Sequence, residues 1–307
     1  MTQSTTDVVV SAVIPTFRAP EALRERVPEL LAQVQTVILV DDGTATTSAL
    51  GIDDPRVEVI ELPENGGIAR ALNVGFDAAR TRGATHVLTL DQDSWIPEGY
   101  VERALRALSD AIRRGEEPVG AVPSSAGGTR VVLDREGVPF DPIQAGQLVR
   151  MDVFDRLGGF DETLFIDAVD SEYTLRAWQH GSRYVLVPDS DIGHELGTLV
   201  PLTVFGRRLV LGGRPRHLLY HAPFRTYYMV RNSVVLARRY GRERRAWTRR
   251  RTRLLTSMIL GGLLVAGDRR AQLLALREGI RDGRAGVGGR IPDELMTRLR
   301  RLGRKVG

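Results

Sequence analysis

Two carboxylates, Asp91 and Asp93, stand one residue apart directly after an apolar run that is typical of a buried strand. In a loop at the end of such a strand both side chains can turn toward one hard cation, and oxygen ligands suit Mg²⁺ or Mn²⁺. A cation held there would neutralise the charge that develops on a departing diphosphate. The alternative is that Asp93 only caps the helix that begins near Pro97.

Two further motifs stand at the ends of predicted elements. Asp41-Asp42-Gly43 follows an apolar run, and Asn65-Gly66-Gly67 opens a helical pattern with Arg70 in its first turn, where a phosphate can meet backbone amides. Each motif alone also fits an ordinary turn or helix cap. Their joint order along the chain, each at a predicted strand end and followed by Asp91-Gln92-Asp93, is far less probable by chance than any one of them.

The elements that position these motifs alternate between strands and helices. Apolar runs predict strands at Val8–Ile14, Val37–Val40, Val57–Ile60 and His86–Leu90, and helical spacing predicts helices at Gly67–Arg82 and Pro97–Arg114. This alternation predicts an α/β fold with a mostly parallel, Rossmann-like sheet and helices on both faces. Ligands of such sheets bind beyond the carboxyl ends of the strands, where all three motifs fall.

The pattern is irregular after residue 115. A strand is predicted at Gly146–Met151, with helices at Val153–Leu157 and Asp170–His180. From Pro201 onward we expect helices, in three amphipathic stretches at 217–240, 244–266 and 269–281. We therefore predict a catalytic domain at 1–200 and a basic helical C-terminal region at 201–307.

Composition excludes several classes of protein. The 307 residues are 42 % hydrophobic and 26 % charged, which is ordinary for a globular protein and excludes disorder. The chain has no cysteine, so any metal must be held by oxygen or imidazole ligands. Residues 1–200 carry a net charge of −15 and residues 201–307 a net charge of +20. The basic region favours a partner that carries phosphate.

No targeting or spanning segment is evident. Residues 1–7 are polar and unlike a signal peptide, and the longest apolar stretch, at 254–266, is shorter than the roughly 20 residues that a spanning helix needs. We expect a protein that is not exported and does not cross a membrane.

Several ordered motifs together resemble the family 2 inverting glycosyltransferases of GT-A fold, and in particular their rhamnosyltransferase-like branch. The resemblance spans roughly residues 8 to 240. It rests on Val13–Phe17, Val40–Thr44, Glu64–Gly75, Leu88–Ser94, Gly158–Glu162, Phe165–Arg176, His194–Gly197 and Tyr227–Asn232.

The resemblance implies a role for each matching residue. Asp91 and Asp93 would hold ribose and metal, with His194 as a further metal ligand, and the cofactor would be Mg²⁺ or Mn²⁺. Trp95, Glu172 and Arg231 are expected on the acceptor side. The residues implied in nucleotide binding, besides Asp91, are Pro15, Thr16, Phe17, Asp42, Asn65, Gly66, Arg70 and Asn73.

Asp170 falls where the family keeps its catalytic base. An inverting transfer needs one carboxylate that takes the proton of the attacking hydroxyl. Asp170 and Glu172 also begin a predicted helix, where carboxylates stabilise free amides, so a capping role and a base at Glu172 stay open. Two departures from the family pattern are Val169, before the base, and Thr44-Ala45-Thr46, after the Asp-Asp-Gly.

The basic region contains arginine clusters at 238–239, 242, 244–245 and 249–251, among tyrosines and Trp247. Such a surface fits a solvated helix face, a nucleic-acid site or a face attracted to anionic lipid. The resemblance favours the membrane, because a transferase that builds envelope glycan works at the cytoplasmic leaflet.

We therefore predict a metal-dependent inverting glycosyltransferase that moves L-rhamnose from dTDP-rhamnose to a hydroxyl of a saccharide or lipid-linked saccharide of the cell envelope. The expected place is the cytoplasm, peripheral at the inner face of the plasma membrane. One alternative is another donor, a UDP-hexose or UDP-galactofuranose. An alternative of another class is a nucleic-acid-binding or inactive nucleotide-binding protein.

Overall fold

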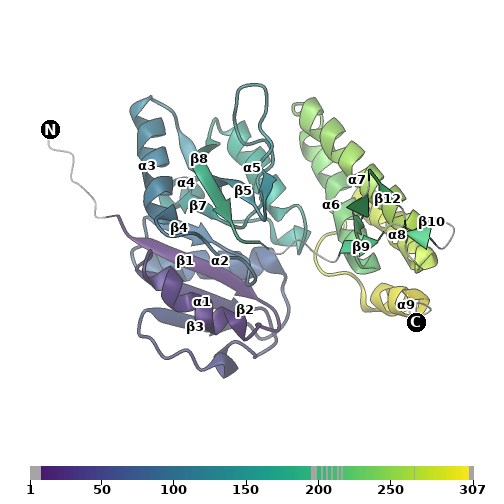
Figure 1. Ribbon diagram of the computed structural model, residues 1–307, viewed down its shortest axis with the longest axis horizontal. Coiled ribbons are helices and arrows are strands. Elements are labelled where there is room, and N and C mark those ends of the chain that lie inside the picture. The colour runs from purple at the N-terminus through teal and green to yellow at the C-terminus, as the bar shows by residue number, and fades with distance from the viewer. Residues whose placement is uncertain are drawn as a thin grey trace. The chain divides into compact units, whose positions relative to one another are not determined.

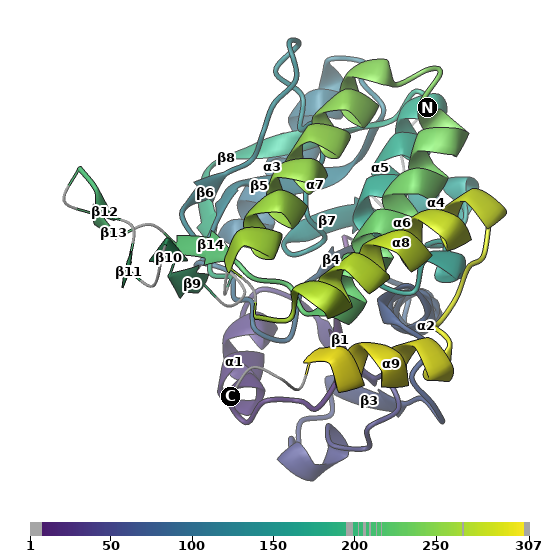
Figure 2. The ribbon, with the colours of Figure 1, turned by 90° about the vertical axis from the view of Figure 1, so that its right-hand side faces the viewer.

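The computed structural model describes residues 8–194, 199–201, 203–204, 207–208, 210–212, 214–215, 217–265 and 267–303. The chain forms two compact units. Unit 1 comprises residues up to 165 together with 169–195, and unit 2 comprises residues 166–168 and those from 196 on. Figures 1 and 2 show a sheet with helices in the purple-to-teal part and mainly helices in the green-to-yellow part.

Unit 1 is built on a sheet in the order β3-β2-β1-β4-β7-β5-β6, with β8 paired to β5. Strands β1, β2, β3 and β4 pair in parallel, as do β5 and β8. β7 runs antiparallel to both β4 and β5, so the sheet is mostly but not wholly parallel, as predicted. The strands are β1 (Val10–Thr16), β2 (Thr36–Asp41), β3 (Val57–Glu61), β4 (His86–Thr89), β5 (Pro118–Ala126), β6 (Thr129–Arg130), β7 (Gln147–Arg150) and β8 (Arg183–Ile192).

Helices cover both faces of this sheet, which confirms the prediction. Buried side chains of α1 and α3 form one core with those of β1, β2 and β4. On the other face Phe76 of α2 stacks on Phe154 of α4, with ring centroids 4.1 Å apart. The helices are α1 (Ala22–Leu31), α2 (Ile68–Thr81), α3 (Tyr100–Arg113), α4 (Met151–Leu157) and α5 (Val169–Gln179), with 3-10 turns at Ser48–Leu50 and Glu162–Leu164.

The register of the central strands fixes where the motifs meet. Thr16 at the end of β1 pairs with Asp41 at the end of β2, and Val13 of β1 pairs with Thr89 at the end of β4. Because these strands are parallel, the loops that follow them leave from one edge of the sheet. The predicted site residues of these loops therefore start from a common edge.

Unit 2 contains α6 (Pro223–Tyr240), α7 (Arg245–Val265), α8 (Arg269–Ala285) and α9 (Asp293–Gly303). Our expectation of helix from Pro201 onward is wrong as far as Leu219. Three antiparallel strand pairs precede α6, and prolines and a left-handed turn at Gly212 favour turns over helix there. The pairs join β9 (Leu199–Pro201) with β14 (His217–Leu219), β10 (Thr203–Val204) with β11 (Arg207–Arg208), and β12 (Val210–Leu211) with β13 (Arg214–Pro215).

Helices α6 and α8 pack closely within unit 2. A Cβ at Gly279 or Gly283 of α8 would lie within 2.8 Å of backbone oxygens of α6, so these two glycines permit the approach. Buried polar pairs cross the same contact, because Thr226 bonds Gln272 at 2.7 Å and the hydroxyl of Tyr227 donates to Asp282 at 2.8 Å. These satisfied pairs fix the register of the two helices.

Candidate active site

Three side chains with metal-ligand chemistry converge at the carboxyl edge of the sheet. Asp91 and Asp93 lie in the loop after β4, and His194 follows β8. The Nδ1 atom of His194 is 3.7 Å from a carboxylate oxygen of Asp91 and 3.9 Å from one of Asp93. One potential ligand atom from each of the three lies within 4.8 Å of the others. In the described part of the chain no other group of three or more acidic or imidazole side chains meets this condition.

A backbone bridge brings His194 to the two aspartates. The N–H of Trp95 donates to the carbonyl of Gly193 at 3.0 Å, and the N–H of Gly193 donates back at 2.9 Å. A Cβ at Gly193 would stand 1.8 Å from the indole of Trp95, so only glycine fits there. Ser94 then orients the histidine ring through a hydrogen bond of 3.0 Å between its hydroxyl and Nδ1.

The three side chains fit a divalent cation by their chemistry. Two carboxylates and an imidazole are a donor set that Mg²⁺, Mn²⁺ and related ions accept. All three residues are only partly buried, so an ion has access. Ser94 bonds the same nitrogen, Nδ1, that faces the two carboxylates, so a cation bound to Nδ1 would replace the hydrogen bond to Ser94. Residues 195–197, which belong to the predicted His194–Gly197 motif, lie outside the described residues.

Gln92, between the two aspartates, holds the loop after β1. Its side-chain oxygen accepts from the N–H of Phe17 at 2.9 Å, and its amide donates to the carbonyl of Phe17 at 3.3 Å. Arg26 of α1 donates to the carbonyl of Gln92 and places its guanidinium 5.2 Å from the ring centre of Trp95. Sequence reasoning missed Gln92 and Arg26, because the Asp-X-Asp pattern drew attention only to the acids. The rings of Phe17 and Trp95 stay exposed, by 44 % and 43 %.

Asp41, at the end of β2, organises its own loop. Its carboxylate accepts seven hydrogen bonds from backbone and hydroxyl groups of residues 44–47, the shortest at 2.6 Å. Burial alone would raise the pKa of Asp41, but the hydrogen bonds from Thr47 and Thr44 outweigh it and hold the pKa well below its usual range. Thr44 and Thr46, which depart from the family pattern, are thus used to bind Asp41.

Asp42 joins β2 to the glycine loop before α2. Its two carboxylate oxygens accept from the N–H groups of Gly66 and Gly67, at 2.7 Å and 3.0 Å. Burial raises the pKa of Asp42, while these two bonds oppose the shift. The buried hydroxyl of Thr16 bonds Thr47 at 2.7 Å, and Pro15 beside it is half-buried in β1. In this structure Asp42 and Thr16 position loops.

The three polar residues around the start of α2 differ in their surroundings. Asn65 keeps its side-chain oxygen buried without a hydrogen-bond partner among the described residues. Arg70 is partly exposed, with its guanidinium 3.9 Å from Glu64. Asn73 donates to the carbonyl of Phe160 at 3.0 Å and to Glu162 at 2.8 Å, and accepts from the N–H of Phe160. Asn65 and Arg70 thus have no bond to a distant loop among the described residues, whereas Asn73 clamps the loop at 158–162.

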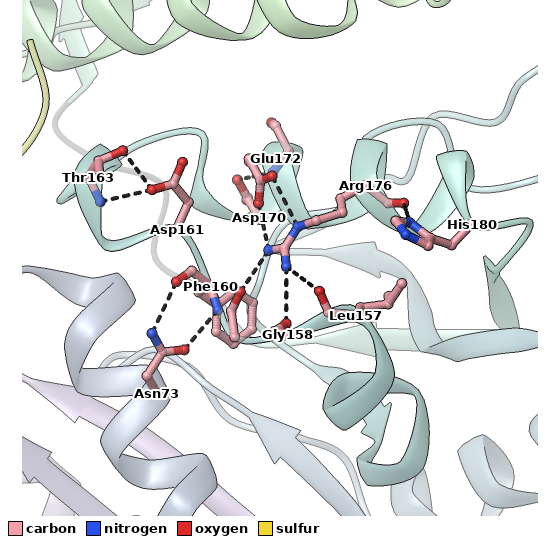
Figure 3. A network of polar contacts seen from close by, with 12 residues as sticks. Asn73, Leu157, Gly158, Phe160, Asp161, Thr163, Asp170, Glu172, Arg176 and His180 are labelled. Atoms are coloured by element: carbon pink, nitrogen blue, oxygen red, sulfur yellow. Dashed lines mark hydrogen bonds and ion pairs between the residues drawn. The ribbon is translucent and has the colours of Figure 1, made fainter. Parts of the chain in front are cut away.

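Asp170 and Glu172 share the first turn of α5 but not their environment (Figure 3). Glu172 is buried and makes two bonds with Arg176, at 3.1 Å and 2.8 Å. Arg176 also donates to the carbonyls of Leu157, Gly158 and Gly159, which ties α5 to the loop that Asn73 holds. Asp170 is only partly buried, and one of its oxygens accepts from the N–H of Ser171 at 2.8 Å.

Arg231, expected on the acceptor side, is 1 % exposed within unit 2. Its guanidinium lies over the rings of Tyr227 and Tyr228, and it donates to the carbonyl of Gly289 at 2.6 Å. Burial of this kind argues against direct contact with an acceptor. Trp95 is exposed and accessible, while Glu172 is enclosed by its ion pair.

Comparisons with known proteins agree with this fold. Residues 11–112 match the model of the family described as Glycosyl transferase family 2. The dTDP-rhamnosyl transferase RfbF of Shigella flexneri is 29 % identical over 248 residues, which cover 75 % of this chain and 80 % of that protein. The polyprenol monophosphomannose synthase of Mycolicibacterium smegmatis is 27 % identical over 221 residues, 60 % of this chain and 78 % of that one.

A solved structure supports the fold assignment. TarS of S. aureus superposes with a TM-score of 0.52 at 16 % identity, over 94 % of this chain and 50 % of that one. The fold is therefore of the GT-A type. Residues 11–112 resemble glycosyl transferase family 2, and this match together with the similarity to RfbF supports a glycosyltransferase.

Proposed function

We propose that this chain is a family 2 glycosyltransferase that catalyses a metal-dependent, inverting transfer of L-rhamnose from dTDP-rhamnose to a hydroxyl of a cell-envelope saccharide. The donor is inferred from the similarity to a dTDP-rhamnosyl transferase over 80 % of its length. The observation that carries the metal dependence is the convergence of Asp91, Asp93 and His194 at the carboxyl edge of the sheet. UDP-hexoses and UDP-galactofuranose are the alternative donors.

The donor would lie across the loops of this edge. Asp91, Asp93 and His194 would hold Mg²⁺ or Mn²⁺, which neutralises charge on the leaving diphosphate when bound. Arg70 supplies a partly exposed guanidinium in the first turn of α2, where the helix dipole also favours phosphate. The buried oxygen of Asn65 has capacity for a hydroxyl donor of the ribose, and the exposed ring of Phe17 for stacking on the base.

Asp170 is the group we assign as general base. It takes the proton from the acceptor hydroxyl while that oxygen bonds the anomeric carbon and the bond to the diphosphate breaks, with the electron pair leaving on the diphosphate. Glu172 is unsuited to this role, because its side chain is buried and both of its carboxylate oxygens accept hydrogen bonds from Arg176. The difference between the two neighbours supports Asp170.

Substitution of the two carboxylates tests this assignment. Asp170→Asn is expected to lower turnover by about 10² to 10⁴ and to keep donor affinity, since the amide preserves shape but accepts no proton. Glu172→Gln is the matched control, and we expect a lower melting temperature with most turnover retained. The readout is release of dTDP from dTDP-rhamnose with Mn²⁺, alongside calorimetry of donor binding. Near-normal turnover in Asp170→Asn with loss in Glu172→Gln would move the base to Glu172.

A thermal-shift panel tests the donor. A ligand that binds the native state raises the melting temperature by mass action. With Mn²⁺ present we expect dTDP-rhamnose to give a larger shift than UDP-glucose or UDP-galactofuranose at equal concentration. A larger shift with either UDP-sugar would show that this UDP-sugar, and not dTDP-rhamnose, is the donor, and would not contradict the proposed nucleotide-sugar site.

We also propose that unit 2 attaches the enzyme to an anionic membrane surface at the cytoplasmic side. In the described part of the chain no helix is long and apolar enough to cross a membrane. Helix α7 has five arginines in its first nine residues and no acid, an arrangement that its own dipole disfavours and an external anion would relieve. In α8 both acids, Glu278 and Asp282, are buried, while Arg277, Arg281 and Arg284 are exposed.

Apolar side chains lie exposed on the same two helices. Leu254 and Leu260 of α7 are 50 % and 57 % exposed, and Leu273 of α8 is 52 % exposed. On α8 a shallow hollow is lined by Leu273, Leu276 and Ile280 with arginines around them. Apolar and cationic groups together fit the interface of an anionic bilayer better than a nucleic acid, which offers no apolar phase.

Sedimentation with vesicles tests this attachment. We expect the protein to sediment with phosphatidylglycerol vesicles at moderate salt and to be released by reversal of the exposed Arg245, Arg249, Arg250 and Arg253 to Glu. A matched control reverses four exposed arginines of unit 1, Arg106, Arg113, Arg114 and Arg135. Failure to bind vesicles together with tight binding to RNA or DNA would favour the nucleic-acid alternative.

A further inference from the structure

The turn before Asp170 has an unusual backbone. Phe165, Asp167 and Ala168 have φ values of +64°, +65° and +64°, although none is glycine. Side chains disfavour this left-handed region, so a run of such residues persists only where its surroundings hold it. The next residue, Val169, begins α5, and Asp170 follows it. Whatever holds this turn therefore helps to set the start of the helix that carries the proposed base.

Asn232 of α6 holds the turn from within unit 2. Its side-chain amide donates to the carbonyl of Ile166 at 2.8 Å and to that of Asp167 at 2.7 Å. Both protons of the amide are thereby used on two consecutive carbonyls of the strained segment. Asn232 is fully buried, so water does not compete for these bonds.

Arg231 fixes the orientation of that amide. Its Nε donates to the side-chain oxygen of Asn232 at 2.9 Å, which leaves the amide nitrogen facing the turn. The guanidinium is itself held between the rings of Tyr227 and Tyr228 and the carbonyl of Gly289. Arg225 also stabilises the turn, because its guanidinium forms an ion pair with Asp167 at 2.7 Å.

From these contacts we propose that Asn232, oriented by Arg231, is a positioning residue for catalysis. It acts through the turn at 165–168 and keeps Asp170 where the acceptor hydroxyl is deprotonated. The Tyr227–Asn232 motif then gains a role through the turn to which Asp170 is joined along the chain. This inference rests on the proposed function of Asp170 as the base.

The kinetic test compares Asn232→Ala with a matched control. We expect at least about tenfold lower kcat for dTDP release from dTDP-rhamnose with Mn²⁺, because a small displacement of a reacting group is costly, while donor Kd stays within about twofold. Thr226→Val removes another buried hydrogen bond of α6 that does not reach the turn, and its kcat should stay near the wild-type value. Equal losses of kcat in both variants, or a loss of donor affinity in Asn232→Ala, would overturn the proposal.

A rescue experiment separates positioning from general destabilisation. Glycine adopts a positive φ without strain, so Ala168→Gly lets the turn form with less help from Asn232. We expect Ala168→Gly to raise the melting temperature of Asn232→Ala and to restore part of its kcat. Recovery of stability without any recovery of kcat would contradict the positioning role.

Hydrogen exchange provides a readout that does not depend on activity. In Asn232→Ala the amides of residues 165–170 should exchange at least about tenfold faster than in the wild type and in Thr226→Val. Unchanged exchange would overturn the proposal. If Asp170→Asn is inactive while Asn232→Ala keeps both kcat and slow exchange, only the positioning role fails. If Asp170→Asn stays active, the proposed base fails, whatever the exchange result.

Discussion

Two pairs of aspartates follow two strands, β2 and β4, which flank β1 on either side. Asp41, the last residue of β2, accepts hydrogen bonds from the loop that follows it, and Asp42 accepts from the glycine loop before α2. Asp91 and Asp93 follow β4 and point their carboxylates toward one histidine. The same residue type at the same edge of one sheet is therefore used in two ways.

The role of an acid at a strand end is therefore decided by its hydrogen-bond partners more than by its residue type. Seven hydrogen bonds satisfy the ionised carboxylate of Asp41, so it has little need of an external cation. At Asp91 and Asp93 two carboxylates and an imidazole lie together, and two neighbouring negative charges attract a cation. The loop after β2 is held in place by hydrogen bonds to Asp41, whereas the loop after β4 leaves Asp91 and Asp93 close to His194.

Loss of Asp41 is expected to have the largest effect on stability. Asp41→Asn should lower the free energy of unfolding by about 2 to 4 kcal/mol, because a neutral amide replaces a charged acceptor of several buried donors. Mn²⁺ binding should change little. Thermal melting with and without Mn²⁺ measures both, with Asp53→Asn, an exposed aspartate, as the control.

The free energy of unfolding should depend on pH through the carboxylate of Asp41. Folding lowers the pKa of Asp41, so its contribution is present above the unfolded pKa of about 4 and is lost as the pH falls toward the folded pKa. Wild-type stability should therefore fall below about pH 4 more steeply than that of Asp41→Asn. Parallel pH curves for the two proteins would show that Asp41 is not the organiser of its loop.

A smaller effect is expected from a substitution at Gly193, beside the group of Asp91, Asp93 and His194. Gly193→Ala would place a Cβ against the indole of Trp95 and disturb the bridge that delivers His194. We expect Mn²⁺ affinity to fall about tenfold, as when a supporting group of a metal site is lost. Gly262→Ala, where nothing lies within 4 Å of the added carbon, is the control. Unchanged Mn²⁺ affinity in Gly193→Ala would separate His194 from the metal site.

Much of the fold could be predicted from the sequence. Strands β1 to β4 and helices α2 and α3 follow from apolar runs and helical spacing, and their predicted ends differ from the observed ones by at most three residues. Helix α1 was not predicted. β5 and β8 escaped prediction, because Pro123, Ser124 and Ser125 interrupt one and Pro188 and Asp189 the other. The apolar alternation of β5 and β8 is weak, and these two strands form because they pair with each other and, for β5, with β7.

The candidate site was predictable in its residues more than in their roles. Asp91, Asp93 and His194 were expected together, and the structure brings them together. Hydrogen bonding across long separations was not readable from sequence: Asn73 clamps residues 87 and 89 positions away, and Asn232 holds residues 65 and 66 positions away. Burial of Arg231 likewise depends on how α6 packs in unit 2.

We propose that Asp91, Asp93 and His194 hold a divalent cation that the donor requires. Calorimetric titration of dTDP-rhamnose, with and without Mn²⁺, tests it most directly when the wild type is compared with Asp93→Asn. We predict that Mn²⁺ strengthens binding to the wild type by about 100-fold and that the variant, with an unchanged melting temperature, loses this effect. Equal donor affinity with and without Mn²⁺ in the wild type, or full metal dependence in Asp93→Asn, would contradict the account.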